Sequence, residues 1–314
     1  MLGLFLQPNA AATISAMPID VHVKKHALNV VLKGYTVIPA AFPASRCAEV
    51  IAEFRAFERA NEAIFAANRN PRGHYPRIVN LHTALPSLAH VFTDNLTTLA
   101  VQDLLFGAPT ALYTSLFYET GSQQPLHRDT PVFSTRPEYL YFGTTVYLEA
   151  AGADNGCLEV MEFGHLMREL DREAMARAHY GSLDALPDMD EDIWNEYQGQ
   201  VTENGRGRGL TVRALHVNAG DTVIWHPQLP HGGSPIRDPS RTRFSLVMHV
   251  TPEGVPVYHQ KAFFNPNEKL PEVAPWPYKT LRGRRVADFR HGISFGHTTQ
   301  YRLDELRTLE TMDA

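Results

Sequence analysis

Residues 121–131 read GSQQPLHRDTP and place His127 and Asp129 two positions apart. In a β-strand, residues i and i+2 point to the same face, so an imidazole and a carboxylate at this spacing can grip one ion. A single His-x-Asp pair is also common on ordinary protein surfaces. Its meaning therefore depends on what the rest of the sequence places beside it.

A second histidine is supplied by GDTVIWHPQLPHGGSP, residues 220–235. A Gly-Asp turn leads into a short apolar strand, and a second turn carries His231 followed by two glycines, which let the backbone pack close to a site. His226 is the rival. We favour His231 because it follows the strand and its turn, where a ligand at the end of a sheet would project. We interpret His226 as a packing or hydrogen-bonding histidine beside Trp225.

An arginine is supplied by RDPSRTRFSLVMHV, residues 237–250. Arg241, Arg243 and Ser245 alternate with period two, which predicts that they face the same side of a strand. An inward arginine is costly unless it meets an anion, and its planar fork suits a carboxylate. The alternative is that at least one of these arginines marks the exposed start of the strand.

Together these segments contain two histidines, one carboxylate and one arginine. Two histidines plus one carboxylate leave coordination positions open, which is the arrangement of iron(II) oxygenases. Two open positions could chelate 2-oxoglutarate, the third could take O2, and the arginine would hold the far carboxylate of the co-substrate. A non-catalytic metal-binding jelly-roll module and a zinc-dependent hydrolase or isomerase are the alternatives. Halogenation is disfavoured because Asp129 occupies the position that a halide would need.

Composition fits one globular domain, 1–314, with 44% hydrophobic and 20% charged residues. A net charge of −5 argues against a nucleic-acid partner, so we expect a small-molecule substrate and a monomer or homodimer. Only Cys47 and Cys157 are present, which excludes a disulfide scaffold and fits a reducing compartment. No apolar stretch approaches the roughly 20 residues of a membrane helix, and the N-terminus lacks a basic region. We therefore expect a cytoplasmic protein without a membrane partner.

Helices are predicted before residue 110 and strands mainly after it. Residues 34–40 read as a strand, Ser45 as the cap of a helix running to about Asn68, and Pro86 to Phe106 as a helix ending at Gly107. Further strands are predicted at 111–118, 140–149, 157–161, 211–217, 221–226 and 243–251. This order indicates a mostly β, double-sheet fold with flanking helices.

Residues 165–210 interrupt the strands with a partly helical, then acidic, then glycine-rich segment. It is either a lid-like insertion over the site or a solvated surface excursion. Weaker site candidates, each equally compatible with ordinary packing, are Gln123 and Gln124 beside the first ligand, and Thr130, Tyr141 and Trp225 as pocket walls. Arg206 and Arg208 in the glycine-rich segment are candidate contacts for an acidic substrate, but we favour a solvated loop there.

From about residue 33 to 252 the sequence resembles the phytanoyl-CoA dioxygenase family. The resemblance lies in GYTVIPAAFPASRCAEVIAEF, LFYETGSQQPLHRDTPVF, TTVYLEAAGADNGCLEVMEFGH and the closing segment from GDTVIWH to FSLVMHV. It implies a double-stranded β-helix (jelly-roll or cupin-like) core, iron(II) and 2-oxoglutarate. It carries the metal triad onto His127, Asp129 and His231, and its Arg-x-Ser pattern favours Arg243, with Arg241 second.

The resemblance leaves the substrate open, because members of this family act on acyl-CoA thioesters, amino acids and many secondary metabolites. The middle strand, VYLEAA, departs from the usual Trp-like or acidic pattern. We predict hydroxylation of an unactivated C–H bond with release of succinate and CO2. Desaturation, demethylation or cyclisation would use the same ligands.

Overall fold

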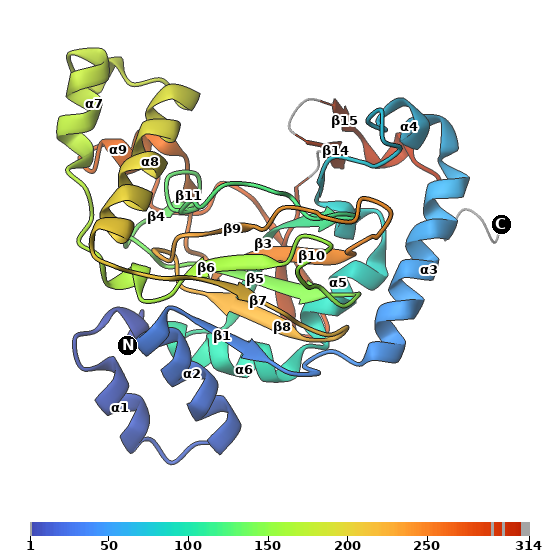
Figure 1. The fold of residues 1–314 in the computed structure, drawn as a ribbon, viewed down its shortest axis with the longest axis horizontal. Coiled ribbons are helices and arrows are strands. Elements are labelled where there is room, and N and C mark those ends of the chain that lie inside the picture. Colours follow the sequence, from blue (N-terminus) through green and yellow to red (C-terminus); the bar gives the residue numbers. More distant parts are fainter. Residues whose placement is uncertain (1, 290–291, 297–298, 309–314) are drawn as a thin grey trace.

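The computed structural model describes residues 2–289, 292–296 and 299–308 and contains two facing sheets (Figure 1). The large sheet has the order β1-β8-β5-β10-β3-β2-β14-β15. Its strands are β1 (Tyr35–Ile38), β8 (Thr222–Trp225), β5 (Phe142–Tyr147), β10 (Ser245–Pro252), β3 (Thr110–Tyr118), β2 (Ile78–Val79), β14 (Ile293–Phe295) and β15 (Thr299–Tyr301). The hairpin of β12 (Tyr278–Leu281) and β13 (Arg284–Ala287) joins it through β3.

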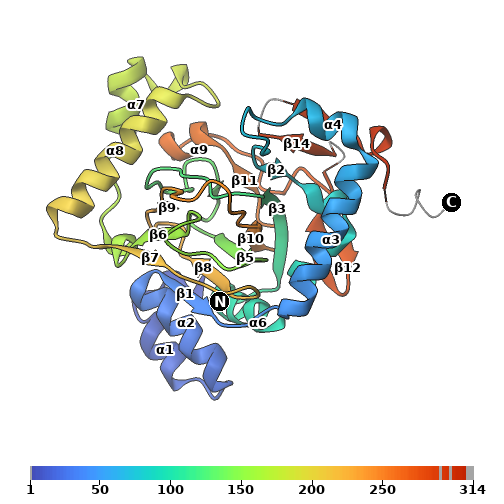
Figure 2. The same cartoon turned by 45° about the vertical axis from the view of Figure 1, so that its right-hand side comes forward.

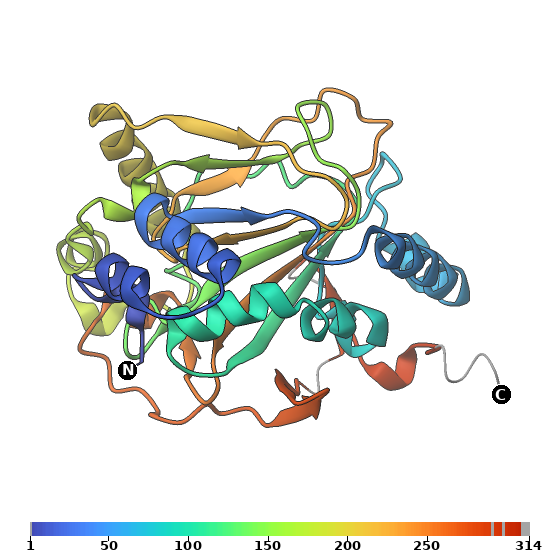
Figure 3. The ribbon, with the colours of Figure 1, turned by 90° about the horizontal axis from the view of Figure 1, so that it is seen from below.

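The small sheet has the order β7-β6-β9, and its strands are β7 (Val212–Leu215), β6 (Leu158–Met161) and β9 (His231–Gly233). Its strands lie over those of the large sheet (Figure 3). Tyr147 and Trp225 of the large sheet and Val160 of the small sheet belong to one buried apolar cluster between the layers. A separate pair is formed by β4 (Ser134–Thr135) and β11 (Val257–Tyr258). The predicted jelly-roll core with flanking helices is confirmed, although helices contain more residues than strands.

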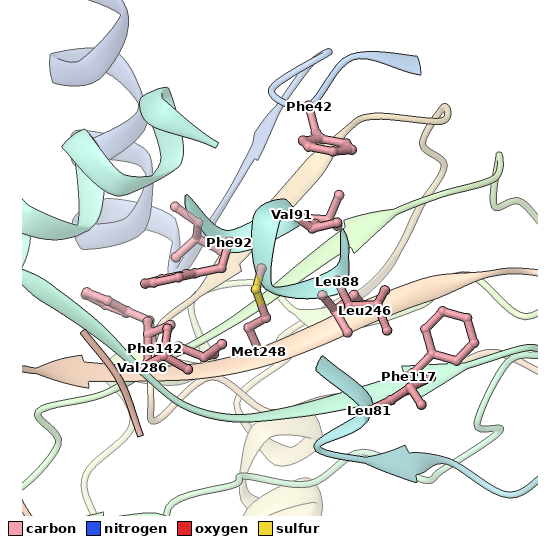
Figure 4. Close-up of a cluster of buried hydrophobic side chains, with 14 of the residues drawn as sticks. Phe42, Leu81, Leu88, Val91, Phe92, Phe117, Phe142, Leu246, Met248 and Val286 are labelled. Carbon is pink, nitrogen blue, oxygen red and sulfur yellow. The ribbon is translucent and has the colours of Figure 1, made fainter. Parts of the chain in front are cut away.

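Helices cover the outer face of the large sheet. Leu88 and Phe92 of α5 (Pro86–Thr93) lie over Leu246 and Met248 of β10 (Figure 4). Each fully buried side chain of this size contributes roughly 1.5–3 kcal/mol of burial free energy. Because side chains alternate along a strand, Ser245 and His249 of β10 point to the opposite face, into the space between the sheets. The packing of this outer layer therefore sets the direction of the inner side chains.

The predicted helices exist but are shorter than expected. The first becomes α3 (Ala44–Ala60) and α4 (Glu62–Ala67), and Pro43 stands at the cap position, so the prediction that Ser45 caps the helix is wrong. The second becomes α5 and α6 (Leu96–Phe106), and it ends as predicted at Gly107 with a left-handed φ of 68°. Three helices lie where none was predicted, α1 (Ala10–Ala16), α2 (Val21–Lys33) and α9 (Gln260–Phe264).

Residues 165–210 lie between β6 and β7 and form α7 (Arg172–Tyr180) and α8 (Glu191–Gly207). Their glycine-rich end was predicted as a loop, but it forms the last turn of α8. Both helices project beyond the strands together with α9 (Gln260–Phe264) (Figure 2), and the three share an apolar cluster of their own. Short 3-10 turns are Leu4–Leu6, Leu81–Thr83, Gly164–Leu166, Leu183–Ala185 and Leu303–Glu305. Within the described ranges, no helix has the length and apolar character needed to cross a membrane.

Candidate active site

The backbone brings His127 and His231 together at the edge of the small sheet. The N–H of each donates to the carbonyl of the other, at N···O distances of 2.8 and 2.9 Å. This contact requires the glycine that follows His231, because a Cβ at Gly232 would lie 2.6 Å from the carbonyl oxygen of Gln124. The expectation that these glycines permit a close backbone approach is therefore met.

Asp129 completes a cluster of three buried donors. Its Oδ1 lies 3.3 Å from His127 Nε2, and its Oδ2 lies 3.4 Å from His231 Nε2. One donor atom from each of the three residues lies within 4.8 Å of the others, close enough for one metal ion. The predicted strand geometry is wrong, because His127 makes only an isolated bridge and Asp129 lies in a bend. A turn in which the Phe133 N–H donates to the Asp129 carbonyl, rather than strand alternation, aims the carboxylate inward.

The electrostatics of the cluster favour a charged carboxylate. Burial of Asp129 alone would favour its neutral form, but attraction to His231 and hydrogen bonds from the surrounding histidines outweigh burial and hold its pKa well below the usual value. Asp129 is therefore ionised at neutral pH and available as a hard anionic ligand.

Both histidines present the same ring nitrogen. His127 Nδ1 lies 2.8 Å from the carbonyl oxygen of Pro125, and His231 Nδ1 lies 3.0 Å from that of Leu229. A carbonyl only accepts, so each Nδ1 carries a proton, and Nε2 is the ring nitrogen that can give up its own proton and bind a metal. Two neutral imidazoles and one carboxylate are the donor set of non-heme iron(II) oxygenases, so these residues fit the predicted metal.

His249 is a polar neighbour that the sequence interpretation missed. Its Nε2 lies 3.1 Å from Asp129 Oδ2, closer than either of the other two histidines. Its buried ring stacks on Phe133 with centroids 3.8 Å apart and planes 11° apart. Its Nδ1 has no hydrogen-bond partner among the described residues. A signal was present, because His249 shares the strand parity of Ser245 within the quoted arginine segment.

Arg243 is buried beside a group of unpartnered polar atoms. Its Nη1 donates to the carbonyl of Gly156 at 3.1 Å, and its guanidinium carbon lies 5.5 Å from the centre of the Tyr147 ring. In the described part of the chain, Arg243 Nε, the Ser245 hydroxyl and the Tyr147 hydroxyl lack hydrogen-bond partners. A buried polar group left unpaired costs roughly 1–3 kcal/mol. Three such groups together fit a carboxylate, such as the far carboxylate of 2-oxoglutarate.

Arg241 lies elsewhere, contrary to the prediction that it shares a strand face with Arg243. Strand β10 begins only at Ser245, so residues 241–244 do not alternate as a strand does. The side chain of Arg241 is about half exposed (49%) and pairs with Asp154 at 3.5 Å. Of the two arginines that the sequence left open, Arg243 is buried beside unpartnered polar atoms and Arg241 is not.

Sequence comparison gives the family. Residues 31–244, more than half of the chain, match the phytanoyl-CoA dioxygenase (PhyH) family. The chain belongs to the phytanoyl-CoA dioxygenase (PhyH) family. The resemblance is therefore confirmed, and this PhyH protein is an iron- and 2-oxoglutarate-dependent oxygenase. No match was found among curated proteins.

Solved structures share the fold of this PhyH protein. One is the epimerase SnoN in complex with Fe3+, alpha ketoglutarate and nogalamycin RO, with 17% identity and a TM-score of 0.58 over 84% of this chain and 98% of that one. Another is EctD from S. alaskensis with 2-oxoglutarate and 5-hydroxyectoine, with 14% identity and a TM-score of 0.57 over 86% and 89%. The carbocyclase SnoK from nogalamycin biosynthesis has 16% identity and a TM-score of 0.54 over 84% and 95%.

Trp225 forms one wall of the PhyH site. Its ring centre lies 4.7 Å from that of His231, and its indole fills the space above Gly143, where a Cβ would lie 2.0 Å from the ring. Its Nε1 has no partner among the described residues. This glycine and tryptophan pair, on adjacent strands β5 and β8, places an indole N–H donor beside the candidate metal ligand His231.

Two of the weaker candidates, Thr130 and Tyr141, are occupied by internal hydrogen bonds. The Thr130 hydroxyl contacts the Tyr141 hydroxyl and the Pro227 carbonyl, each at 2.9 Å. Gln123 is exposed and accepts from the Ile236 N–H at 3.0 Å. Gln124 is half-buried, while Arg206 and Arg208 are exposed at the end of α8.

His226 lies outside the cluster of metal donors. Its Nδ1 accepts from the Gln228 N–H at 3.1 Å, and its ring packs against Phe5 and His165. Burial holds its pKa well below the usual value, so it is neutral. These contacts agree with its interpretation as a packing histidine.

The insertion touches the ligand segment directly. The ring of Trp194, on α8, has its centre 6.1 Å from that of His127. Arg128, between the two first ligands, is buried, and its backbone N–H and carbonyl pair with the Gln198 side chain at 2.8 and 2.9 Å. Its guanidinium donates to the carbonyl of Gly164 at 3.0 Å. Helix α8 is thus attached to the backbone that carries the ligands.

Proposed function

We propose that this PhyH protein uses iron(II), O2 and 2-oxoglutarate to hydroxylate an unactivated C–H bond of a small-molecule metabolite. Substrate, O2 and 2-oxoglutarate give hydroxylated product, succinate and CO2. The observation that carries the proposal is the buried donor cluster of His127, Asp129 and His231, in which backbone carbonyls orient both imidazole rings through Nδ1 and turn Nε2 toward Asp129. When bound, iron and the co-substrate supply the oxidising chemistry.

The residues of the chain bind, orient and exclude water. Arg243 and Ser245 receive the far carboxylate of 2-oxoglutarate through their unpartnered polar atoms. Trp225 and Tyr147 form walls that keep water from the site, since both are buried. Product release and substrate entry then require a movable part of the surface.

Residues 165–210 are the part that we propose acts as a lid within the single domain. Trp194 lies near His127 but is only half-buried, so substrate can bury it further. The buried, unpaired cysteines Cys47 and Cys157 and the net charge of −5 support action in the cytoplasm, as a monomer or homodimer without nucleic-acid or membrane partners.

A second outcome uses the same site. The epimerase SnoN and the carbocyclase SnoK share this fold, so desaturation, demethylation or cyclisation is the alternative to hydroxylation. The ligands would be the same, and the position of the substrate would decide between the outcomes.

Succinate release with iron(II), measured over a metabolite panel, tests the proposal. A coupled substrate should raise succinate release and gain one oxygen atom from labelled O2, whereas desaturation would remove two hydrogens without gaining oxygen. Absence of succinate at every substrate would favour the non-catalytic metal-binding module. Hydrolysis or isomerisation supported by zinc alone would favour a zinc enzyme.

A further inference from the structure

A positively charged cleft of about 600 Å³ lies against the segment that precedes the first metal-ligand candidate. Its charged lining residues are Arg72, Arg77 and Arg241, and His74 lies beside them. No aspartate or glutamate of the described residues lines it. The chain as a whole carries a net charge of −5, so the charge of this cleft is opposite in sign to the net charge of the protein.

The cleft borders the proposed active site through Tyr118. This side chain lines the cleft, and its ring centre lies 5.9 Å from the guanidinium carbon of Arg243. Burial raises the pKa of Tyr118, Arg77 hydrogen-bonds to it, and Asp129 adds to the rise through its charge. Pro125, whose carbonyl fixes the ring of His127, also lines the cleft. A molecule in the cleft is therefore separated from Arg243 of the proposed clamp by Tyr118, and from the candidate ligand His127 by Pro125.

Two arginines of the cleft, Arg72 and Arg241, are available to a ligand. The Arg72 side chain is exposed and has no ion-pair partner among the described residues. Arg241 pairs only with exposed Asp154 at 3.5 Å, a surface contact of the kind that contributes about 0–1 kcal/mol. The buried carboxylate of Glu119 follows Tyr118 in the chain and pairs with Arg55 at 2.6 Å and with His74 at 3.5 Å. A ligand anion would thus meet the unpaired charge of Arg72 and the weakly paired charge of Arg241.

We propose that this cleft binds an anionic group, a carboxylate or phosphate, of the primary substrate and so places the remainder of the substrate at the triad. The inference rests on the proposed function and names its substrate class. Arginine forks recognise such groups bidentately, and Arg72 and Arg241 come from two separate segments of the cleft wall. 2-Oxoglutarate is also an anion, so the cleft could instead be only the entry route of the co-substrate.

A matched probe pair, benzoate and benzamide, separates these two sources. Both have the same shape, and only benzoate is charged. Binding is measured by saturation-transfer NMR on the full-length protein loaded with cobalt(II) and saturating 2-oxoglutarate. We expect benzoate to bind at least about tenfold more tightly than benzamide, and Arg72→Gln to weaken benzoate about fivefold. Arg59→Gln, at an exposed arginine of α3 that does not line the cleft, is the control and should leave benzoate affinity unchanged.

Each of the following results would overturn the inference. Equal affinity for benzoate and benzamide would show that the cleft does not recognise charge. Unchanged benzoate affinity in Arg72→Gln would show that benzoate binds to other residues. Loss of benzoate binding when 2-oxoglutarate is raised from a sub-saturating to the saturating concentration would assign the cleft to the co-substrate, and so would a loss of 2-oxoglutarate affinity in Arg72→Gln equal to the loss for benzoate. Because binding is measured without turnover, an inactive protein that still selects benzoate would refute the proposed function alone. Turnover of only neutral substrates would refute this inference alone.

Discussion

Replacing His249 tests whether a residue outside the proposed triad controls metal binding. His249→Phe keeps a flat ring for stacking on Phe133 but removes the hydrogen-bond donor to Asp129, which is 3.1 Å away. A hydrogen bond to a charged group contributes about 1.5–3 kcal/mol, and loss of a residue that orients a metal ligand typically costs about 10–100-fold in metal affinity. The two ranges agree, since tenfold corresponds to about 1.4 kcal/mol. We therefore expect His249→Phe to weaken metal binding by about 10–100-fold.

His249→Gln is the matched variant, because the glutamine amide nitrogen can take the place of imidazole Nε2 and still donate to Asp129. We expect its metal affinity to stay within about threefold of the parent. The assay is the dissociation constant for cobalt(II), measured by competition with a chelator, with the thermal midpoint as the control for folding. Equal weakening in both variants would assign the effect to packing, and unchanged affinity in His249→Phe would refute a positioning role.

Three further predictions concern the clamp, the ligands and the insertion. Arg243→Ala should raise the apparent Michaelis constant for 2-oxoglutarate at least about a hundredfold, roughly 2.7 kcal/mol, because a buried charge contact is lost. Arg241→Ala, at an exposed arginine, should have a small effect, and the reverse ranking in a co-substrate titration would assign the clamp to Arg241. His231→Ala should nearly abolish succinate release without unfolding the protein by circular dichroism, and loss of activity in His226→Ala instead would show that the ligand assignment is wrong. Hydrogen exchange in 165–210 should be fast in the free protein and slow on substrate binding, and strong protection without substrate would count against a lid.

The site was predictable from sequence because its chemistry needs particular residue types at short spacing. His127 and Asp129 were found through the i, i+2 rule, yet the structure holds them by a single bridge and a bend. The residues were identified because close spacing in the chain limits their separation in space, whatever the local backbone does. His249 was missed because it belongs to no short motif, and its contact with Asp129 spans 120 positions of the chain.

The helices show why local patterns reach only part of the fold. Apolar spacing predicted one helix from Ser45 to about Asn68, but the helix is interrupted at Asn61, which caps the C-terminus of α3. The Asn61 side-chain amide donates to the carbonyls of Phe57 at 2.9 Å and of Arg307 at 3.0 Å. The second bond connects positions 246 residues apart, so no window of local sequence contains it. Helix existence follows from periodicity, whereas helix ends depend on such long-range partners.

Strand β10 connects the stability of the fold with the proposed chemistry. Its outward side chains Leu246 and Met248 pack under the outer helices (Figure 4). Its inward side chains Ser245 and His249 lie at the proposed co-substrate clamp and at Asp129. Four residues of strand span about 13 Å, so one rigid element sets the separation between the clamp and the metal ligands. Pairing of β10 with β3 and β5 on both sides fixes its register. A one-residue slip would turn the inward residues outward, so apolar packing on the far face of the sheet holds the inner polar groups in position. The arginines of the cleft that we assign to the substrate anion come instead from loops at 70–77 and 236–241, which can change charge without disturbing this strand.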